Sequence, residues 1–136
     1  MTVRLTRVVW FRAHHRLADP TASAEANRAR FGWTAESHPH QYRCEVTVTG
    51  PVDPAQPMVM DLGLLDRVLV EEVVDPLDGR HLDRDVPAFR EALPTCEGIA
   101  LELFRRIAGR LPTGVTLARV AVAEDESLYA ECLGPS

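Results

Sequence analysis

Apolar and polar residues alternate along two stretches of the chain, which is the pattern of a β-strand with one buried face. The first stretch covers residues 3–11 and the second covers residues 41–49. The apolar side of the second stretch is formed by Tyr42, Cys44, Val46 and Val48. Between the two strands, residues 18–30 are polar and rich in alanine, so this segment predicts either a helical turn or a loop.

Apolar residues recur at helical spacing in two later stretches. The first helix is expected to begin at Leu62, with Asp61 as its N-cap, and to stop at Pro76. The second helix starts at residues 94–95, where Thr95 is the predicted N-cap, and closes before Pro112.

Two short strands are expected after the second helix, at residues 116–123 and 128–132, joined by an acidic turn at residues 124–126. The resulting order is ββααββ. Strands before and after a block of helices predict an α+β fold, in which two helices cover one face of an antiparallel four-stranded sheet. The chain shows no internal repeat, so we expect one domain over residues 1–136.

Composition narrows the class of protein. The chain has 136 residues, of which 46% are hydrophobic and 26% charged, values typical of a globular domain. No apolar run approaches the length of a membrane span, and the first residues show no signal-peptide pattern, so we expect a cytoplasmic protein that does not bind membranes. The net charge of -5 argues against a general nucleic-acid surface. Three widely spaced cysteines indicate neither a disulfide framework nor a cysteine zinc site.

The five histidines are clustered, and this is the main chemical signal. His38 and His40 are separated by one residue, so on an extended chain both imidazoles point the same way. One more histidine from a neighbouring strand would complete three ligands for zinc, with a fourth position open for catalysis. A polar loop explains the same spacing without any metal.

Zinc bound there could act as a Lewis acid on an alcohol or carbonyl and ease proton abstraction from a neighbouring carbon, which requires a base. The candidates are Glu36, Asp78 and His81. Each also has a plain structural interpretation, as a loop carboxylate, a turn residue or a surface side chain.

Seven segments, taken in order, resemble the signature segments of one enzyme family. They are residues 11–17 (FRAHHRL), 31–32 (FG), 38–42 (HPHQY), 58–62 (MVMDL), 77–78 (LD), 94–97 (PTCE) and 122–124 (VAE), with Asn27 before the second. Over nearly its whole length the chain therefore resembles the 6-pyruvoyl-tetrahydropterin synthase and 6-carboxytetrahydropterin synthase family. The resemblance implies the tunnelling fold, assembled into trimers that stack as hexamers, with sites at subunit interfaces.

The resemblance also implies roles for individual residues. By position, the implied zinc ligands are His15, His38 and His40. Glu124 matches the carboxylate that anchors the pterin ring, a task that suits its two oxygens. Thr95 and Glu97 are implied contacts to the pterin from a neighbouring chain.

The chain departs from the family where protons are moved. Thr34 stands where active members usually carry a cysteine base, and a threonine hydroxyl is a poor base. Asp78 is kept, but Gly79 replaces the histidine expected beside it. Two interpretations stay open: either Glu36 serves as the base and His81 takes the place of the missing histidine, or the usual elimination is absent and the site does something else.

Three hypotheses follow. The first is a zinc-dependent carbon–oxygen lyase acting on the side chain of a small-molecule pterin, dihydroneopterin triphosphate or a relative, in a homo-oligomer (trimer or hexamer). The second is an aldolase-like cleavage of that side chain at the same site. The third is a non-catalytic pterin-binding homologue, which kept the metal for stability; three ligands argue against it, since structural zinc is normally closed by four.

Overall fold

Two long antiparallel strands pair with each other along their whole length, and both extend further than the alternating pattern predicts. The computed structural model describes all residues 1–136. Strand β1 (Val3–His15) pairs with β2 (His38–Gly50), in a register that sets His15 opposite His38. Strands β3 (Thr116–Asp125) and β4 (Leu128–Cys132) complete an antiparallel sheet in the order β1-β2-β3-β4. The histidines that sequence spacing groups together therefore lie on strands, at one end of the sheet.

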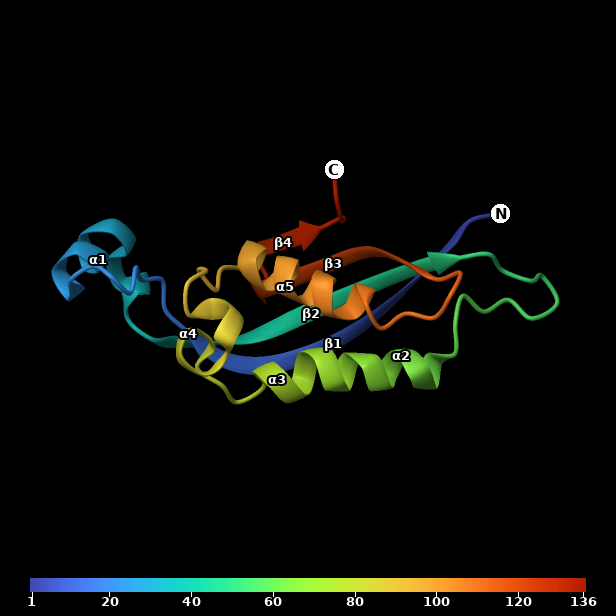
Figure 1. Ribbon diagram of the computed structural model, residues 1–136, viewed down its shortest axis with the longest axis horizontal. Coiled ribbons are helices and arrows are strands. Elements are labelled where there is room, and N and C mark those ends of the chain that lie inside the picture. Colours follow the sequence, from blue (N-terminus) through green and yellow to red (C-terminus); the bar gives the residue numbers. More distant parts are fainter.

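The main helices cover one face of this sheet, which confirms the predicted α+β fold (Figure 1). They are α2 (Leu62–Leu69), which continues through η2 (Val70–Val74) into α3 (Asp75–Leu77), and α5 (Cys96–Ala108). Four shorter elements join them: α1 (Ala24–Phe31), η1 (Gly32–Ala35), α4 (Leu82–Asp85) and η3 (Pro87–Phe89). Helix α1 projects beyond the end of the sheet where β1 stops and β2 begins.

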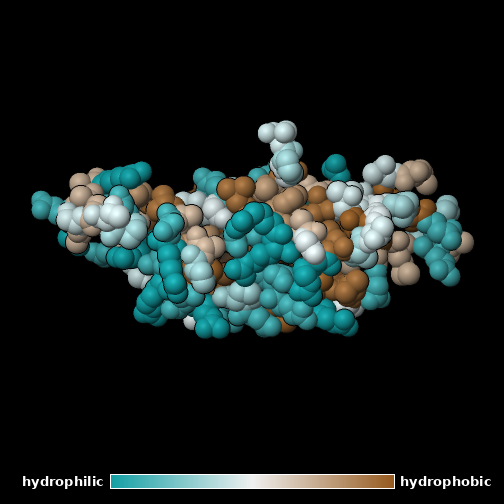
Figure 2. Space-filling model, viewed as in Figure 1, coloured by the Kyte–Doolittle hydropathy of each residue, from teal (hydrophilic) through white to brown (hydrophobic).

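The space between the sheet and the helices is filled by one cluster of 22 buried residues. Phe11 of β1 and Tyr42 of β2 stack there with ring centroids 4.9 Å apart. Leu65 and Leu69 from α2 and Ile99, Leu103 and Ile107 from α5 are fully buried against them. Each such side chain stabilises the fold by roughly 1.5–3 kcal/mol relative to exposure. The outer surface of the helices is mostly hydrophilic, with apolar side chains showing between them (Figure 2).

Both predicted N-caps are confirmed, but the predicted end of the first helix is wrong. The Asp61 carboxylate accepts from Leu64 N at 2.9 Å, and the Thr95 hydroxyl accepts from Gly98 N at 3.1 Å. The helix ends at Leu77, one residue past Pro76. A π-helical turn directly precedes the proline, and this wider turn accommodates a residue that lacks a backbone N–H.

The expected acidic turn at residues 124–126 also needs correction. Strand β3 runs through Asp125, so Glu124 belongs to the strand. Because side chains alternate along a strand, Glu124 faces the same side as the buried Val122. The shift matters because it brings a carboxylate to the histidine end of the sheet. None of the helices combines the length and the apolar character that a membrane-spanning helix requires.

Candidate metal centre

Four side chains from three adjacent strands meet at one point, and we call them the metal cluster: His15, His38, His40 and Glu124. One ligand atom from each lies within 4.8 Å of the others. The three imidazole centroids are 4.5 to 5.0 Å apart, and each ring stands edge-on to the next. The pairing of β1 with β2 explains the convergence, since Ala13 and His15 face His40 and His38 across the ladder.

Backbone carbonyls fix which nitrogen of two of these rings carries the proton. His15 Nδ1 lies 2.7 Å from Pro94 O, and His38 Nδ1 lies 2.7 Å from Glu36 O. A carbonyl oxygen only accepts hydrogen bonds, so each Nδ1 is the donor and each Nε2 keeps a free lone pair. Such outer partners orient the histidine ligands of metal sites.

Two ring nitrogens of the metal cluster make no hydrogen bond, and the cluster fits a cation. His15 Nε2 and His40 Nε2 are both buried and form no bond that meets hydrogen-bond geometry. Glu124 Oε2 nevertheless lies 2.6 Å from His40 Nε2 and 3.8 Å from His15 Nε2, so a negative charge faces both nitrogens. Buried polar atoms without a hydrogen bond are unfavourable, and a divalent cation beside this carboxylate would satisfy both nitrogens.

The electrostatics of His15 point the same way. Its side chain is only 3% exposed, and burial lowers its pKa to about 4, although the hydrogen bond to Pro94 acts in the opposite direction. The imidazole is therefore neutral at pH 7. Neutral imidazole is the form that binds a metal ion.

Three residues beside the metal cluster were not singled out from the sequence as site residues. The Tyr42 hydroxyl is buried without a partner, and burial together with the nearby Glu124 raises the pKa of its phenol. Cys96 Sγ lies 3.9 Å from Glu124 Oε1, and burial raises the pKa of this thiol to about 12. The Trp33 ring lies 4.8 Å from that of His38. Only Tyr42 gives a sequence signal, because strand alternation puts it on the face of His40.

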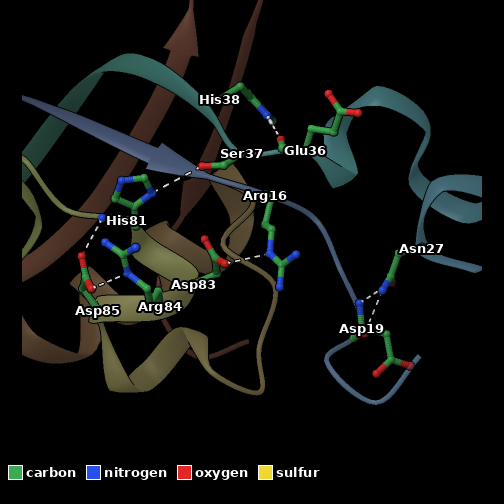
Figure 3. A network of polar contacts seen from close by, with 10 residues as sticks. All are labelled: Arg16, Asp19, Asn27, Glu36, Ser37, His38, His81, Asp83, Arg84 and Asp85. Atoms are coloured by element: carbon green, nitrogen blue, oxygen red, sulfur yellow. Dashed lines mark hydrogen bonds and ion pairs between the residues drawn. The ribbon is translucent and has the colours of Figure 1, made fainter. Parts of the chain in front are cut away.

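Glu36, the predicted base, does not lie in the metal cluster. Its carboxylate is 70% exposed and forms an ion pair with Arg28 of α1, with Arg28 Nη2 3.2 Å from Oε1. Only its backbone oxygen contacts the site, through the hydrogen bond from His38. Figure 3 shows the Glu36 side chain pointing away from the His38 ring.

His81 and Asp78 belong to a segment, residues 78–81, that hydrogen-bonds to the outer edge of β1. The His81 ring stacks on His14, with ring centroids 4.6 Å apart. Its Nδ1 is 3.4 Å from Ser37 Oγ (Figure 3). Strand alternation places His14 on the face opposite to His15, so His81 also faces away from the metal cluster. The Asp78 carboxylate accepts from Arg12 N at 2.9 Å.

Gly79, at the position of the missing histidine, has φ 75° and donates its N–H to Arg12 O at 2.7 Å. Glycine adopts this left-handed conformation without strain. Open space surrounds the position, because a Cβ added there would meet nothing within 4 Å. The structure thus leaves room for a side chain at this point of the β1 edge.

The two remaining predicted residues are at the start of α5. The Thr95 hydroxyl is used as the helix cap, and Glu97 is exposed in the first turn. Neither belongs to the metal cluster. Their position next to Cys96 nevertheless keeps them near Glu124.

Comparisons with known proteins give a consistent result. A family profile described as 6-pyruvoyl tetrahydropterin synthase matches residues 4–135. The human 6-pyruvoyl tetrahydrobiopterin synthase is 37% identical over 126 residues, which cover 91% of this chain and 86% of the human one. A dihydroneopterin monophosphate aldolase from Pyrococcus furiosus is 35% identical over 96 residues, covering 71% of this chain and 77% of the aldolase.

The fold agrees with these sequence relationships. The solved structure of the Caenorhabditis elegans 6-pyruvoyl tetrahydropterin synthase superposes with a TM-score of 0.91 at 30% sequence identity. The superposition covers 99% of this chain and 97% of the other.

Proposed function

Because this chain belongs to the 6-pyruvoyl tetrahydropterin synthase family, we propose that it is a zinc-dependent lyase acting on the side chain of a pterin. The observation that carries the proposal is the metal cluster. It combines histidine nitrogens whose tautomers suit a cation with a carboxylate that suits the ring N–H groups of a pterin.

In this proposal, the residues that would hold zinc are His15, His38 and His40. When bound, zinc supplies a Lewis acid that polarises side-chain oxygens and makes the adjacent carbon more acidic. The protein holds two of these rings ready for this role, because Pro94 O keeps Nδ1 of His15 protonated and Glu36 O keeps Nδ1 of His38 protonated, which leaves Nε2 of both rings free.

Glu124 is proposed to anchor the pterin ring. A carboxylate can accept two parallel hydrogen bonds, which matches the amino and ring N–H donors of a pterin. Its Oε1 faces the Cys96 thiol and its Oε2 faces His40, so its orientation is fixed from both sides. Thr95 and Glu97, at the start of α5, are proposed as pterin contacts within the assembled protein.

Proton transfer is assigned to Glu36, with Asp78 and His81 as its partners. Glu36 needs only to leave its exposed pair with Arg28 to turn toward a ligand. Asp78 and His81 are in the segment bonded to the outer edge of β1, where Asp78 accepts from Arg12 N and His81 stacks on His14, and neither belongs to the metal cluster of their own chain. We therefore propose that they act at the site of a neighbouring copy, in a homo-oligomer (trimer or hexamer).

The open edges of the sheet support such an assembly. Strands β1 and β4 are the two outer strands. The backbone of β1 is bonded to residues 78–80 at Arg12 and His14, and elsewhere an outer strand presents unpaired N–H and C=O groups that can pair with another copy. The three cysteines are free, which suits the reducing cytoplasm where we place the protein.

Aldolase-like cleavage of the side chain is the second candidate, and two observations favour it. One of the relatives is named a dihydroneopterin monophosphate aldolase. The side chain at the family's cysteine position, Thr34, is occupied in a hydrogen bond to Phe31 O and is a poor base. A cleavage of this kind needs a base but no cysteine.

The deciding experiment offers the zinc-loaded protein dihydroneopterin triphosphate and dihydroneopterin monophosphate, and identifies products by mass. Loss of triphosphate from the first compound supports the lyase. Formation of a shortened pterin from either compound supports the aldolase. Pterin binding without any product supports a non-catalytic homologue. His38→Ala, which removes a zinc ligand, is the control and should form no product.

A further inference from the structure

Trp33 is a largely exposed aromatic residue that contacts the metal cluster. Its side chain is 69% exposed, and its ring centroid lies 4.8 Å from that of His38, with the planes tilted by 58°. Single exposed apolar side chains are common and need no explanation by themselves. What sets Trp33 apart is its contact with a predicted metal ligand.

The turn that carries Trp33 is held in place. Element η1 begins at Gly32, which has φ 63°, and Glu36 N donates to Trp33 O at 3.0 Å. Leu17 N donates to Thr34 O at 2.8 Å, which ties the turn to the chain leaving β1. The indole is therefore presented from a pinned turn, and its position relative to His38 is defined.

The other side chains of the metal cluster are far less exposed than Trp33. The side chain of His15 is 3% exposed, and those of Glu124 and His40 are 15% and 17% exposed. His38 is half-buried, and the exposed indole of Trp33 is in contact with it. Trp33 therefore presents an exposed aromatic ring next to the place where a ligand of the metal cluster would bind.

We propose that Trp33 is a substrate-binding residue, whose indole packs on the flat ring of the pterin bound at the metal cluster. This inference rests on the proposed function. A pterin is a planar conjugated bicycle, so its edge and its face need different partners. The Glu124 carboxylate suits the N–H groups of the edge, and an exposed indole beside His38 suits the face.

The chain provides its own control. Trp10 is the only other tryptophan and is also exposed, at 52%. It lies on β1 opposite Arg43, whose guanidinium is 5.5 Å from the indole centroid. Strand alternation puts Trp10 on the outer face of the sheet, away from His15. A bound pterin should therefore affect Trp33 and leave Trp10 unchanged.

The test uses fluorine NMR on zinc-loaded full-length protein labelled with 5-fluorotryptophan. Two resonances are expected, and Trp10→Phe and Trp33→Phe assign them. At saturation with neopterin, the Trp33 resonance should shift and the Trp10 resonance should stay in place. Calorimetric affinities for neopterin should fall roughly tenfold in Trp33→Ala, as stacking losses of this kind do. Trp33→Phe, which keeps a ring, and Trp10→Ala should both stay within about threefold of the parent protein.

Other outcomes overturn the inference. If neopterin binds and the Trp33 resonance does not move, or if Trp33→Ala binds equally well, Trp33 is no ligand contact, while the proposed function stands. If the Trp33 resonance changes with protein concentration and not with neopterin, a second copy covers it, which also refutes the inference. If the zinc-loaded protein binds neither neopterin nor dihydroneopterin triphosphate, the proposed function fails with it.

Discussion

The metal cluster and the three side chains proposed to move protons lie at the same end of the molecule, but they are held in opposite ways. The metal cluster sits on paired strands, and two of its rings are locked by backbone carbonyls. The second group, which we call the outer set, consists of Glu36, Asp78 and His81. These residues lie on turns and on a strand edge, and their side chains are engaged with Arg28, Arg12 N and His14.

The difference lies in what one chain brings together. The metal cluster is formed within one chain, because strand pairing alone brings its four side chains together. The outer set does not converge on it, because its side chains are engaged elsewhere. Efficient proton transfer requires precise placement, so under the proposed function the outer set would depend on the ligand or on a neighbouring copy for its final geometry.

The largest effect is expected from Glu36→Gln, which keeps the shape of the side chain and removes the base. Turnover of the pterin substrate should fall by about 10²–10⁴-fold, the usual contribution of a general base. Zinc content and pterin affinity should remain within about twofold, because the backbone oxygen that orients His38 is kept. Steady-state rates and metal analysis give both quantities.

Glu25→Gln is the matched control, since Glu25 is an exposed carboxylate in the first turn of α1. It should leave turnover unchanged. Full activity of Glu36→Gln would remove Glu36 from the mechanism. The base of either the lyase or the aldolase-like reaction would then have to be sought among the other members of the outer set, Asp78 and His81.

A large effect is also expected from His15→Ala in the metal cluster. Zinc affinity should fall by more than about 100-fold. Loss of a residue that only hydrogen-bonds to a metal ligand already lowers metal affinity about 10–100-fold, and His15 is proposed to be a ligand itself. The adjacent His14→Ala is the control: His14 faces the opposite side of the sheet and stacks on His81, so zinc affinity should be unchanged. Competition with a chelating dye measures both variants. Equal losses in the two would contradict the assigned strand faces.

The metal cluster should also make the metal-free protein sensitive to acid. The pKa of His15 is about 4 in the folded protein, below its ordinary value of 6.5, because of burial. The folded state then binds fewer protons than the unfolded state. The free energy of unfolding is therefore unaffected by His15 above pH 6.5 and decreases as the pH falls from 6.5 toward 4. Between pH 7 and pH 5 the loss should be about 2 kcal/mol.

Urea unfolding of chelator-treated protein at the two pH values measures this change. In His15→Asn the part of the pH dependence due to His15 should disappear. An unchanged pH dependence in this variant would show that the imidazole is not held neutral by burial.

Strand alternation and histidine spacing predict that His38 and His40 point the same way, because they are two residues apart on one strand. The third ligand, His15, is implied only by the family resemblance, and the pairing of β1 with β2 sets it opposite His38. The order of elements likewise predicts the sheet and the helices that cover it. These features are local or depend on a simple period, so a single sequence contains them.

Features that depend on register across strands could not be predicted in the same way. Glu124 reaches His40 because β3 is longer than its apolar pattern, and it lies where the pairing of β3 with β4 is irregular, between Ala123 and Asp125. The contact of Trp33 with His38 depends on the path of η1. The continuation past Pro76 requires a π-helical turn. None of these leaves a periodic signal in the sequence.

Gly79→His tests the outer set with a smaller effect. The substitution restores a histidine beside Asp78 and should lower the free energy of unfolding by about 1 kcal/mol, because a side chain at φ 75° is strained. Space is available for it. Urea unfolding measures the cost, and Gly79→Ala separates backbone strain from the effect of the imidazole. A rise in turnover with histidine, absent with alanine, would show that the outer set lacks a proton-transfer group. A loss of several kcal/mol would show that the edge of β1 has no room.

The smallest effect is expected from Arg28→Ala, which releases Glu36 from its ion pair. The two side chains are 72% and 70% exposed, and exposed pairs contribute less than about 1 kcal/mol, so the free energy of unfolding should change by about 0.5 kcal/mol or less. If Glu36 must leave Arg28 to act, turnover should stay the same or rise slightly, since the resting pair no longer competes. Urea unfolding and steady-state rates measure the two effects on one variant. A fall in turnover would mean instead that Arg28 positions Glu36 for proton transfer. The outer set would then be organised within one chain, as the metal cluster is.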